Sequence, residues 1–356
     1  MRIEENRALG PLTTLGIGGP ARWFAEAESE EDVAEAAAWA GERGKELFVL
    51  GGGSNLLVSD AGFSGLVLRV ALRGIAALDA EGDTGARVYQ AGAGEDWDGF
   101  VERTVEDGCA GIECLAGIPG TVGGTPVQNV GAYGQEVASA IERVRAFDLK
   151  HHAFVEFPGG ECGFAYRRSR FNTADRGRYV VTRVDYRLTP GGAPTVRYAD
   201  LQKALAERGE GAGKASLSEV AAVVRRVRQG KGMLLVEGEA DCRSAGSFFK
   251  NPVVSEEQVW AIAAAGGKEP PRFPAGAGLE SAGLVKIPAA WLIEHAGFSK
   301  GYRRGAAGIS SRHTLALVNL GGATADDVLE LAREIGTAVE RRFGIGLEME
   351  PVCIGF

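Results

Sequence analysis

The hydrophobic positions of this chain switch repeatedly between helical and strand spacing. Helices are predicted where Ser or Thr is followed three residues later by Asp, Glu or Gln, because these side chains satisfy the free N–H groups of a helix start. Apolar residues then recur every three or four positions in four segments, which start at Ser29, Ser216, Ser255 and Thr324. Gly44 is expected to end the first helix, since glycine readily adopts the left-handed conformation that follows a helix.

Strands are predicted between these helices. Residues 47–50 read Leu-Phe-Val-Leu and predict a short buried strand, and residues 66–68 and 88–89 are strand-like as well. Residues 180–188 alternate strictly between two faces, which favours a half-exposed antiparallel strand. One face of that strand would carry Val180, Thr182, Val184, Tyr186 and Leu188. The chain ends on the apolar, strand-like residues 352–354.

A segment rich in helix and strand breakers, residues 189–194, reads Thr-Pro-Gly-Gly-Ala-Pro and is a candidate domain boundary. We therefore expect an α+β architecture with a first domain over residues 1–190, in two lobes of approximately 1–65 and 66–190. A smaller mixed domain would follow over residues 191–356, and its last segment could pack back on the first domain.

Composition and charge narrow the class of protein. The chain has 356 residues and a net charge of -8, which argues against nucleic acid or an anionic membrane as the main partner. Its five cysteines are scattered and form no C-x-x-C pair, a pattern that favours reduced thiols over disulfides or a zinc site. We find no signal-peptide pattern and no membrane-spanning run. The expectation is a cytoplasmic protein without a bound metal or an obligate protein partner.

Glycine is unusually abundant, with 53 residues, and the glycines cluster. The first cluster, Gly51-Gly52-Gly53-Ser54-Asn55, follows the predicted strand at 47–50. Consecutive N–H groups in such a turn can form a concave nest for a diphosphate. The string is neither a Rossmann fingerprint nor a Walker loop. On its own it is equally well explained as a tight turn.

The second cluster runs from Leu115 to Gly134 and holds six glycines, two prolines and few charges. Such a segment loses much conformational entropy when it becomes ordered. Packing of its backbone against a flat, uncharged aromatic ligand would offset that cost. A purely structural bend is the alternative.

Taken in order, residues 13–19 (Thr-Thr-Leu-Gly-Ile-Gly-Gly), the 51–55 loop and residues 116–124 resemble the FAD-binding half of the UDP-N-acetylenolpyruvoylglucosamine reductase family. The resemblance covers essentially the whole chain. It implies a vanillyl-alcohol-oxidase-type FAD-binding fold, a non-covalent FAD and NADPH as hydride donor. The residues that it assigns to the cofactor are Gly51, Gly52, Gly53, Ser54, Asn55, Gly117, Ile118, Pro119, Gly120, Thr121, Gly123, Gly124, Asn129 and Tyr133.

The same resemblance implies three catalytic residues. Arg167 lies among aromatic residues in 164–171, and its planar guanidinium could grip a carboxylate through two parallel hydrogen bonds. Ser247, in Ser-Ala-Gly-Ser-Phe-Phe-Lys-Asn-Pro, is the implied proton donor. Glu350 is the implied acid, but Met349 breaks the family's usual Leu-Glu-Pro-Glu order, so Glu348 stays an alternative. Without the resemblance, these residues would be read as an exposed basic loop, a turn serine and solvent-facing acids.

Six further residues are assigned to the UDP-sugar by the resemblance: Tyr198, Arg228, Lys231, Lys250, Asn251 and His313. Tyr198 resembles the tyrosine of a loop that closes over the substrate in the longer class of these enzymes. Arg228 and Lys231 match diphosphate-binding positions. The family's common Lys-Leu-Pro-Asp-Pro is replaced here by Lys-Gly-Met-Leu-Leu, which leaves the path of the loop after Lys231 open.

The implied reaction is the reduction of UDP-N-acetyl-3-O-(1-carboxyvinyl)-glucosamine to UDP-N-acetylmuramate by NADPH through FAD, in peptidoglycan precursor synthesis. Two alternatives stay open. An oxidase of the same fold could attach FAD covalently through Cys109 or Cys114. A nucleotide-sugar sensor or flavin carrier would explain the glycine loops but not the three catalytic residues.

Overall fold

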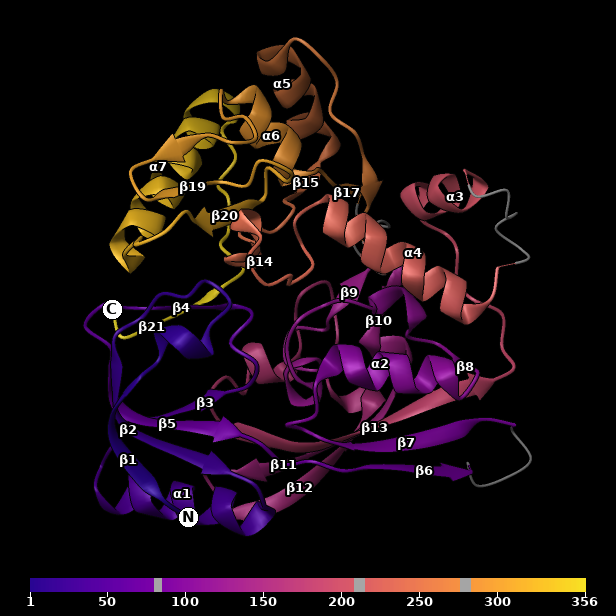
Figure 1. The fold of residues 1–356 in the computed structure, drawn as a ribbon. Coiled ribbons are helices and arrows are strands. Elements are labelled where there is room, and N and C mark those ends of the chain that lie inside the picture. Colours follow the sequence, from indigo (N-terminus) through magenta and orange to yellow (C-terminus); the bar gives the residue numbers. More distant parts are fainter. Residues whose placement is uncertain (80–84, 208–214, 276–282) are drawn as a thin grey trace. The chain divides into compact units, whose positions relative to one another are not determined.

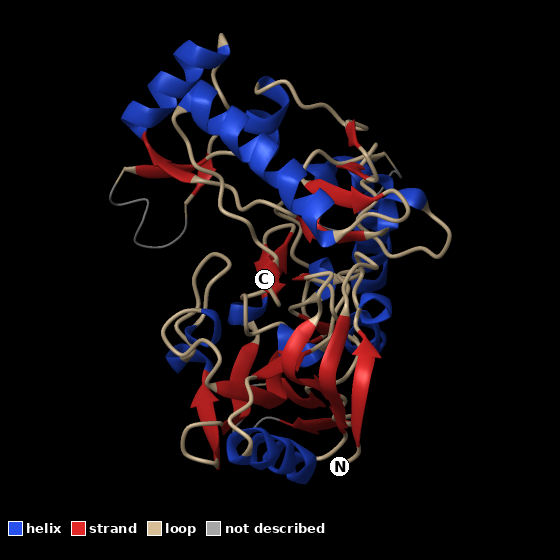
Figure 2. Cartoon of the chain, turned by 90° about the vertical axis from the view of Figure 1, so that its left-hand side faces the viewer, coloured by secondary structure: helices blue, strands red, loops and turns tan. Residues whose placement is uncertain are grey.

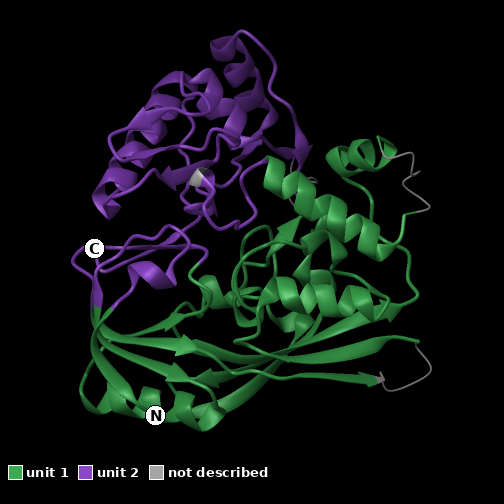
Figure 3. Ribbon diagram, viewed as in Figure 1, with its two compact units in different colours: residues 1–7, 21–53, 64–230 green, residues 8–20, 54–63, 231–356 purple. Residues whose placement is uncertain are grey.

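The computed structural model describes residues 1–79, 85–207, 215–275 and 283–356. By compactness the chain divides into two units (Figure 3). The first comprises residues 1–7, 21–53 and 64–230, and the second comprises residues 8–20, 54–63 and 231–356. The first unit thus extends to residue 230 and not to the expected boundary at 190. The reason is that helix α4 (Leu217–Gly230) packs against α2 (Trp97–Glu106) and α3 (Ala199–Ala206) within that unit.

The first unit begins with a four-stranded sheet in the order β1-β2-β5-β3 (Figure 1). Its strands are β1 (Ile3–Ala8), β2 (Pro20–Ala27), β5 (Phe63–Val70) and β3 (Leu47–Leu50). Helix α1 (Glu30–Glu42) is capped by Ser29 and Asp32 as predicted, and Gly44 follows it with a φ of 58°. The prediction of a buried strand at 47–50 is only partly right. Of its four residues only Leu50 is buried, because β3 lies at the edge of the sheet.

A longer antiparallel sheet runs in the order β12-β11-β13-β7-β6, and the short β8 also pairs with β13. Its strands are β6 (Ile75–Asp79), β7 (Arg87–Gly92), β8 (Cys109–Ala110), β11 (Ile141–Asp148), β12 (Ala153–Pro158) and β13 (Tyr179–Pro190). Strand β13 confirms the alternating strand predicted at 180–188 and is antiparallel to both β11 and β7. Its second face is less exposed than predicted, since Val181 and Asp185 are buried as well.

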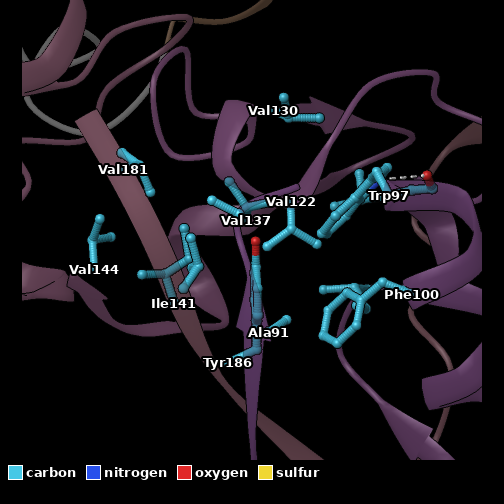
Figure 4. Close-up of a cluster of buried hydrophobic side chains, with 14 of the residues drawn as sticks. Ala91, Trp97, Phe100, Val122, Val130, Val137, Ile141, Val144, Val181 and Tyr186 are labelled. Atoms are coloured by element: carbon cyan, nitrogen blue, oxygen red, sulfur yellow. Dashed lines mark hydrogen bonds between the residues drawn. The ribbon is translucent and has the colours of Figure 1, made fainter. Parts of the chain in front are cut away.

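A buried aromatic cluster lies between this sheet and the second glycine cluster, residues 115–134, which we call the second glycine segment (Figure 4). The rings of Phe100 and Tyr186 are 5.0 Å apart, and Trp97 lies 5.8 Å from Phe100. The Trp97 indole N–H donates to the carbonyl of Leu115 at 3.2 Å, and the hydroxyls of Tyr186 and Thr125 are 2.6 Å apart. The cluster therefore supports both ends of residues 115–125.

In its described residues the second unit contains three small sheets and three α-helices. Figure 2 distinguishes the helices and strands of the chain by colour. Helix α7 contacts α5, α6 and strands β19 and β20, and the predicted caps at Ser255 and Thr324 are present. The helices are α5 (Glu256–Gly266), α6 (Ala289–His295) and α7 (Ala325–Phe343). The strands are β14 (Ser244–Ser247), β20 (Ala316–Asn319), β19 (Ala307–Ile309) and β18 (Arg303–Arg304) in one sheet, β15 (Val253–Ser255), β17 (Leu284–Lys286) and β16 (Phe273–Pro274) in another, and β4 (Leu56–Val58) with β21 (Val352–Ile354).

The pairing of β4 with β21 joins segments far apart in the sequence. The two strands are parallel, with Val352 opposite Leu56 and Ile354 opposite Val58. The predicted strand at the end of the chain is thus present, and its partner comes from residues that precede position 65. Both strands belong to the second unit, so this unit includes residues from the early part of the chain.

Within the described ranges, no helix has both the length and the apolar character required to cross a membrane. The same residues contain no group of three or more His, Cys, Asp or Glu side chains arranged to hold a metal ion.

Asp148, at the end of β11, is a buried carboxylate that stabilises the first unit. It is 1% exposed and is bound by the Arg178 guanidinium at 2.7 Å, the His151 ring at 2.8 Å and the N–H of Lys150 at 2.9 Å. The Arg178 guanidinium, helped by these hydrogen bonds against the effect of burial, holds the pKa of Asp148 far below its usual value.

We therefore expect Asp148→Asn to destabilise the protein by about 1.5–3 kcal/mol at pH 7, the loss typical of a hydrogen bond to a charged group. Because the folded-state pKa is depressed, this stabilisation is present above the unfolded pKa of about 3.9 and decreases as the pH falls below it. Urea unfolding at pH 7 and pH 3 should show a smaller difference between wild type and variant at pH 3. The exposed Glu106→Gln on α2 is the control. An equal difference at both pH values would contradict the assignment.

Candidate active site

The two glycine clusters meet within the first unit. A β-carbon at Gly52 would lie 2.6 Å from Cα of Gly120 and 2.9 Å from its carbonyl carbon, and one at Gly51 would lie 2.9 Å from Oγ1 of Thr121. Gly53 has a φ of 63°, in the left-handed region that glycine adopts without strain. Backbone therefore packs directly on backbone here, with no room for a side chain between the two segments.

The second glycine segment is fixed from below by residues 93–97. The backbone N–H of Gly123 donates to the Ala93 carbonyl at 2.8 Å, and that of Val122 donates to the Glu95 carbonyl at 2.9 Å. In turn, the backbone N–H of Trp97 donates to the Gly120 carbonyl at 3.1 Å. A β-carbon at Gly123 would lie 2.6 Å from that of Ala93. These glycines are thus needed for close packing as well as for a ligand, and the segment is held in one conformation.

Both backbone groups of Gly117 are held by charged side chains. Its N–H donates to Asp98 at 2.6 Å, and its carbonyl accepts from Nε of Arg228 at 2.9 Å. Arg225 also binds Asp98, at 2.8 Å. Burial lowers the pKa of Arg228, and the nearby Tyr133 hydroxyl and Asp98 carboxylate oppose this effect. In the first unit Arg228 therefore contacts the glycine segment. Its role toward a substrate diphosphate stays a prediction.

Three candidate residues share a strained backbone conformation. Asn129, Tyr133 and Arg167 have φ values of 45°, 50° and 55°, and they make up three of the five non-glycine residues with positive φ in the described part of the chain. Such a conformation costs of order 1–3 kcal/mol for a non-glycine residue and tends to occur at functional sites. The concentration of strain here supports the assignment of this region as a site.

The Arg167 turn is tied to residues 127–131 by three side chains. Nδ2 of Asn129 donates to the Ala165 carbonyl at 3.0 Å, Oγ of Ser169 to Val127 at 2.6 Å, and Nη2 of Arg167 to Gly131 at 3.0 Å. The Asn129 amide also binds Glu136 and the N–H of Ala138. Asn129, expected at the cofactor, thus has a clear structural task in holding the turn that carries Arg167.

Tyr133 lies at the tip of a hairpin formed by β9 (Gly131–Ala132) and β10 (Gln135–Glu136). Its ring packs edge-to-face on Tyr198, with centroids 5.5 Å apart. Tyr198 directly precedes α3 and is 39% exposed. The structure therefore places a residue predicted for the cofactor beside one predicted for the substrate.

Within the second unit, the Ser247 strand pairs with the segment that holds the two candidate acids. Ser247 lies opposite Ala316 in the β14–β20 ladder, and an isolated bridge joins Phe249 to Met349. Lys250 N–H donates to the Glu348 carbonyl, and Glu350 N–H donates to the Phe248 carbonyl, both at 2.9 Å. Glu350 is thus hydrogen-bonded to the residue that follows Ser247.

The side chains of the two acids differ in their surroundings. Glu348 is 73% exposed at its side chain and forms an ion pair with Lys250 at 2.5 Å. Glu350 is half-buried. Met349, which departs from the family pattern, lies opposite Phe249 and does not displace Glu350 from the Ser247 strand. This geometry favours Glu350 over Glu348 as the functional acid.

The end of the first glycine cluster reaches this strand pair. Nδ2 of Asn55 donates to the carbonyl of Glu350 at 3.3 Å, and the Asn55 carbonyl accepts from the N–H of Val352 at 3.0 Å. Thr14 donates to the Ser244 carbonyl at 2.6 Å and lies 3.5 Å from the carbonyl of Ser54. Thr14 belongs to the 13–19 motif, but its contact with the Ser247 strand could not be inferred from sequence.

The remaining substrate candidates also lie in the second unit. Oδ1 of Asn251 accepts from the N–H of Ala289 and so helps to begin α6. The backbone N–H of His313 donates to the Ser310 hydroxyl at 3.2 Å. The loop after Lys231 passes Asp241, whose β-carbon would be 3.1 Å from a β-carbon at Gly232. Near its start this loop therefore lies beside Asp241, and further along the N–H of Val236 donates to the Cys242 thiol at 3.2 Å.

Gly52→Ala tests the contact between the glycine segments. The new β-carbon would meet the backbone of Gly120, which cannot move aside, so we expect FAD to bind roughly 10- to 100-fold more weakly, as for an overpacked site. Gly41→Ala in α1 is the matched control, since its β-carbon would meet nothing within 4 Å. Flavin fluorescence titration of the apoprotein measures both. Wild-type FAD affinity in Gly52→Ala would refute the predicted contact.

Comparison with known proteins identifies both halves of the chain. A family model described as an FAD binding domain matches residues 21–150, and the UDP-N-acetylenolpyruvoylglucosamine reductase C-terminal domain matches residues 238–354. These matches confirm the expected fold class, an FAD-binding part followed by a mixed C-terminal domain.

Relatives named UDP-N-acetylenolpyruvoylglucosamine reductase match over nearly the full length. The Streptomyces avermitilis protein is 47% identical, with 98% of this chain and 93% of the relative covered. The Thermobifida fusca protein is 44% identical, with 99% and 98% covered. The crystal structure of the same reductase from Thermus caldophilus is 30% identical, covers 99% of both chains and has a TM-score of 0.66. The chain belongs to the UDP-N-acetylenolpyruvoylglucosamine reductase family.

Proposed function

We propose that this protein reduces the enolpyruvyl group of UDP-N-acetyl-3-O-(1-carboxyvinyl)-glucosamine to give UDP-N-acetylmuramate, with NADPH as reductant and FAD as cofactor. The product is a peptidoglycan precursor. The observation that carries the proposal is the pairing of residues 248–250 with 348–350, which joins the Ser247 strand to Glu350 within one unit. The five free cysteines are compatible with the reducing cytoplasm, where we place the enzyme.

The first unit offers a suitable place for FAD. Consecutive N–H groups of a glycine turn such as Gly51 to Gly53 can receive a diphosphate. The close approach of Gly52 to Gly120 holds this turn against the second glycine segment. Gly51 to Gly53 and Gly117 to Gly124 would hold the cofactor. When bound, FAD supplies the two-electron chemistry that connects NADPH to the carbon–carbon double bond of the substrate.

A covalent flavin is not supported by the candidate cysteines. Cys114 is fully buried, and its thiol donates to the carbonyl of Thr195 at 2.9 Å. Burial, with a smaller effect of the Glu113 charge, raises its pKa to about 12. Because the thiolate is the nucleophile, this thiol is unreactive at neutral pH. Cys109 is fully buried as well and accepts a hydrogen bond from Tyr89.

Residues of the chain would stabilise the negative charge that forms on the substrate and would donate the proton. Reduction of the double bond leaves negative charge on the carbon next to the substrate carboxylate. Arg167 would bind that carboxylate, and its turn is already fixed to residues 127–131. Ser247 would deliver a proton to the carbon. Glu350 would assist Arg167 at the substrate carboxylate, as a hydrogen-bonding or protonated partner. Tyr198, Arg228, Lys231, Lys250, Asn251 and His313 are proposed to bind the UDP-sugar.

Ser247→Ala tests the proton donor. We expect NADPH to bleach the flavin at the wild-type rate, while reoxidation by the UDP-sugar slows by about 10²- to 10⁴-fold, the usual contribution of a general acid. Stopped-flow absorbance at the flavin band follows both half-reactions in one preparation, so the first is an internal control for folding and cofactor binding. Reoxidation at the wild-type rate would show that another group gives the proton.

A pair of variants distinguishes the two acids. Glu350→Gln is expected to slow reoxidation by the UDP-sugar at least about 10²-fold, the effect of one positioned electrostatic group. Glu348→Gln should keep most of the activity, because its side chain is exposed and loses only its ion pair with Lys250. The same stopped-flow assay measures both. The reverse outcome, with Glu348→Gln inactive, would assign the acid to Glu348.

A further inference from the structure

A buried carboxylate beside the second glycine segment has no part in the proposed reaction. Glu113 is 0% exposed and accepts hydrogen bonds from the N–H of Gly111 at 2.8 Å, Nε2 of Gln135 at 2.8 Å and the N–H of Thr195 at 2.7 Å. Burying a carboxylate costs free energy unless donors of this kind surround it. The position of Glu113 is therefore best explained by the segments that it holds together.

Two neighbours complete a cluster that we call the Glu113 anchor, made of Glu113, Cys114 and Gln135. Oε1 of Gln135 accepts from the N–H of Cys114 at 2.7 Å. The Cys114 thiol donates to the carbonyl of Thr195 at 2.9 Å, and its pKa of about 12 keeps it protonated at neutral pH. Both backbone groups of Thr195 are thus fixed by the anchor.

The anchor acts on the segment that carries Tyr198. Strand β13 ends at Pro190, Thr195 follows five residues later, and Tyr198 comes three residues after Thr195. The Tyr198 ring rests on Tyr133, which lies two residues before Gln135. One buried cluster therefore connects the second glycine segment, the Tyr133 hairpin and the base of the Tyr198 segment.

We propose that Glu113, Cys114 and Gln135 are positioning residues that hold Tyr198 ready to close over the UDP-sugar. The inference rests on the proposed function, in which Tyr198 contacts that substrate. Fixing Thr195 restricts the conformations of Tyr198 before binding, so less conformational entropy is lost when the substrate is bound. The anchor therefore acts on the affinity for the UDP-sugar and leaves the reduction of the flavin by NADPH unchanged.

Cys114→Ala in the FAD-loaded enzyme is the mildest test, because it removes one hydrogen bond to Thr195. We expect the Kd for the UDP-sugar, measured by perturbation of the oxidised flavin spectrum, to rise about fivefold, as for one neutral hydrogen bond. Cys114→Ser restores a donor and should recover most of the affinity. Glu113→Gln, which places an amide N–H against that of Gly111, should raise the Kd by about 10- to 100-fold.

Cys162→Ala is the matched control for loss of a buried thiol. Cys162 is also 0% exposed in the first unit, but its thiol points to the carbonyl of Pro158 at 3.6 Å and does not contact Thr195. It should bind the UDP-sugar as wild type does. Should Glu113→Gln fail to fold, the three cysteine variants still decide the question. Equal effects of Cys114→Ala and Cys162→Ala would overturn the proposal.

Tyr198→Ala separates this inference from the function on which it rests. If the anchor works through Tyr198, Cys114→Ala should add no further loss to Tyr198→Ala. Full additivity, or slower bleaching by NADPH or loss of FAD in Cys114→Ala, would overturn the anchor while leaving the reductase function intact. Wild-type substrate affinity in Tyr198→Ala would remove Tyr198 from the proposed substrate site, and the anchor's role with it.

Discussion

The site in the first unit depends on one constraint, the direct packing of two glycine segments backbone to backbone. With 2.6 Å between the place of a Gly52 β-carbon and Cα of Gly120, no other residue fits at position 52 without displacing the chain. The second segment can meet this demand because residues 93–97 and the aromatic cluster around Trp97 hold it in place. The packed core on one side and the surface proposed to bind FAD on the other are thus two sides of the same segment.

Rigidity in this region is obtained at the cost of backbone strain. Asn129, Tyr133 and Arg167 keep left-handed conformations because side-chain hydrogen bonds and neighbouring strands hold them there. An arginine with the role proposed for Arg167 would gain from such fixation, since a flexible guanidinium would lose entropy on each binding event. The strain, the tethered turn and the proposed chemistry therefore have a common explanation.

The second unit combines early and late parts of the chain around Glu350. Its segment pairs with Phe248 to Lys250 on one side and with Asn55 on the other, so the backbone position of Glu350 is set by residues from three separate stretches of sequence. In this arrangement the backbone position of Glu350 does not depend on the side chain at position 349. The hydrogen bonds are made by the backbone of Glu348, Glu350 and Val352, and none requires a particular side chain at position 349.

Local signals in the sequence determined the capped helices, the alternating strand at 180–188 and the two glycine clusters, because capping, alternation and glycine turns act within a few residues. Family resemblance named Arg167, Ser247 and Glu350. Only the tertiary structure decided the exposure of β3, the bond between Asn55 and Glu350, 295 positions apart, and the anchor at Glu113. In sequence Glu113 resembles any surface acid. Its burial becomes favourable only when donors from three separate segments converge on it, and no local pattern encodes that convergence.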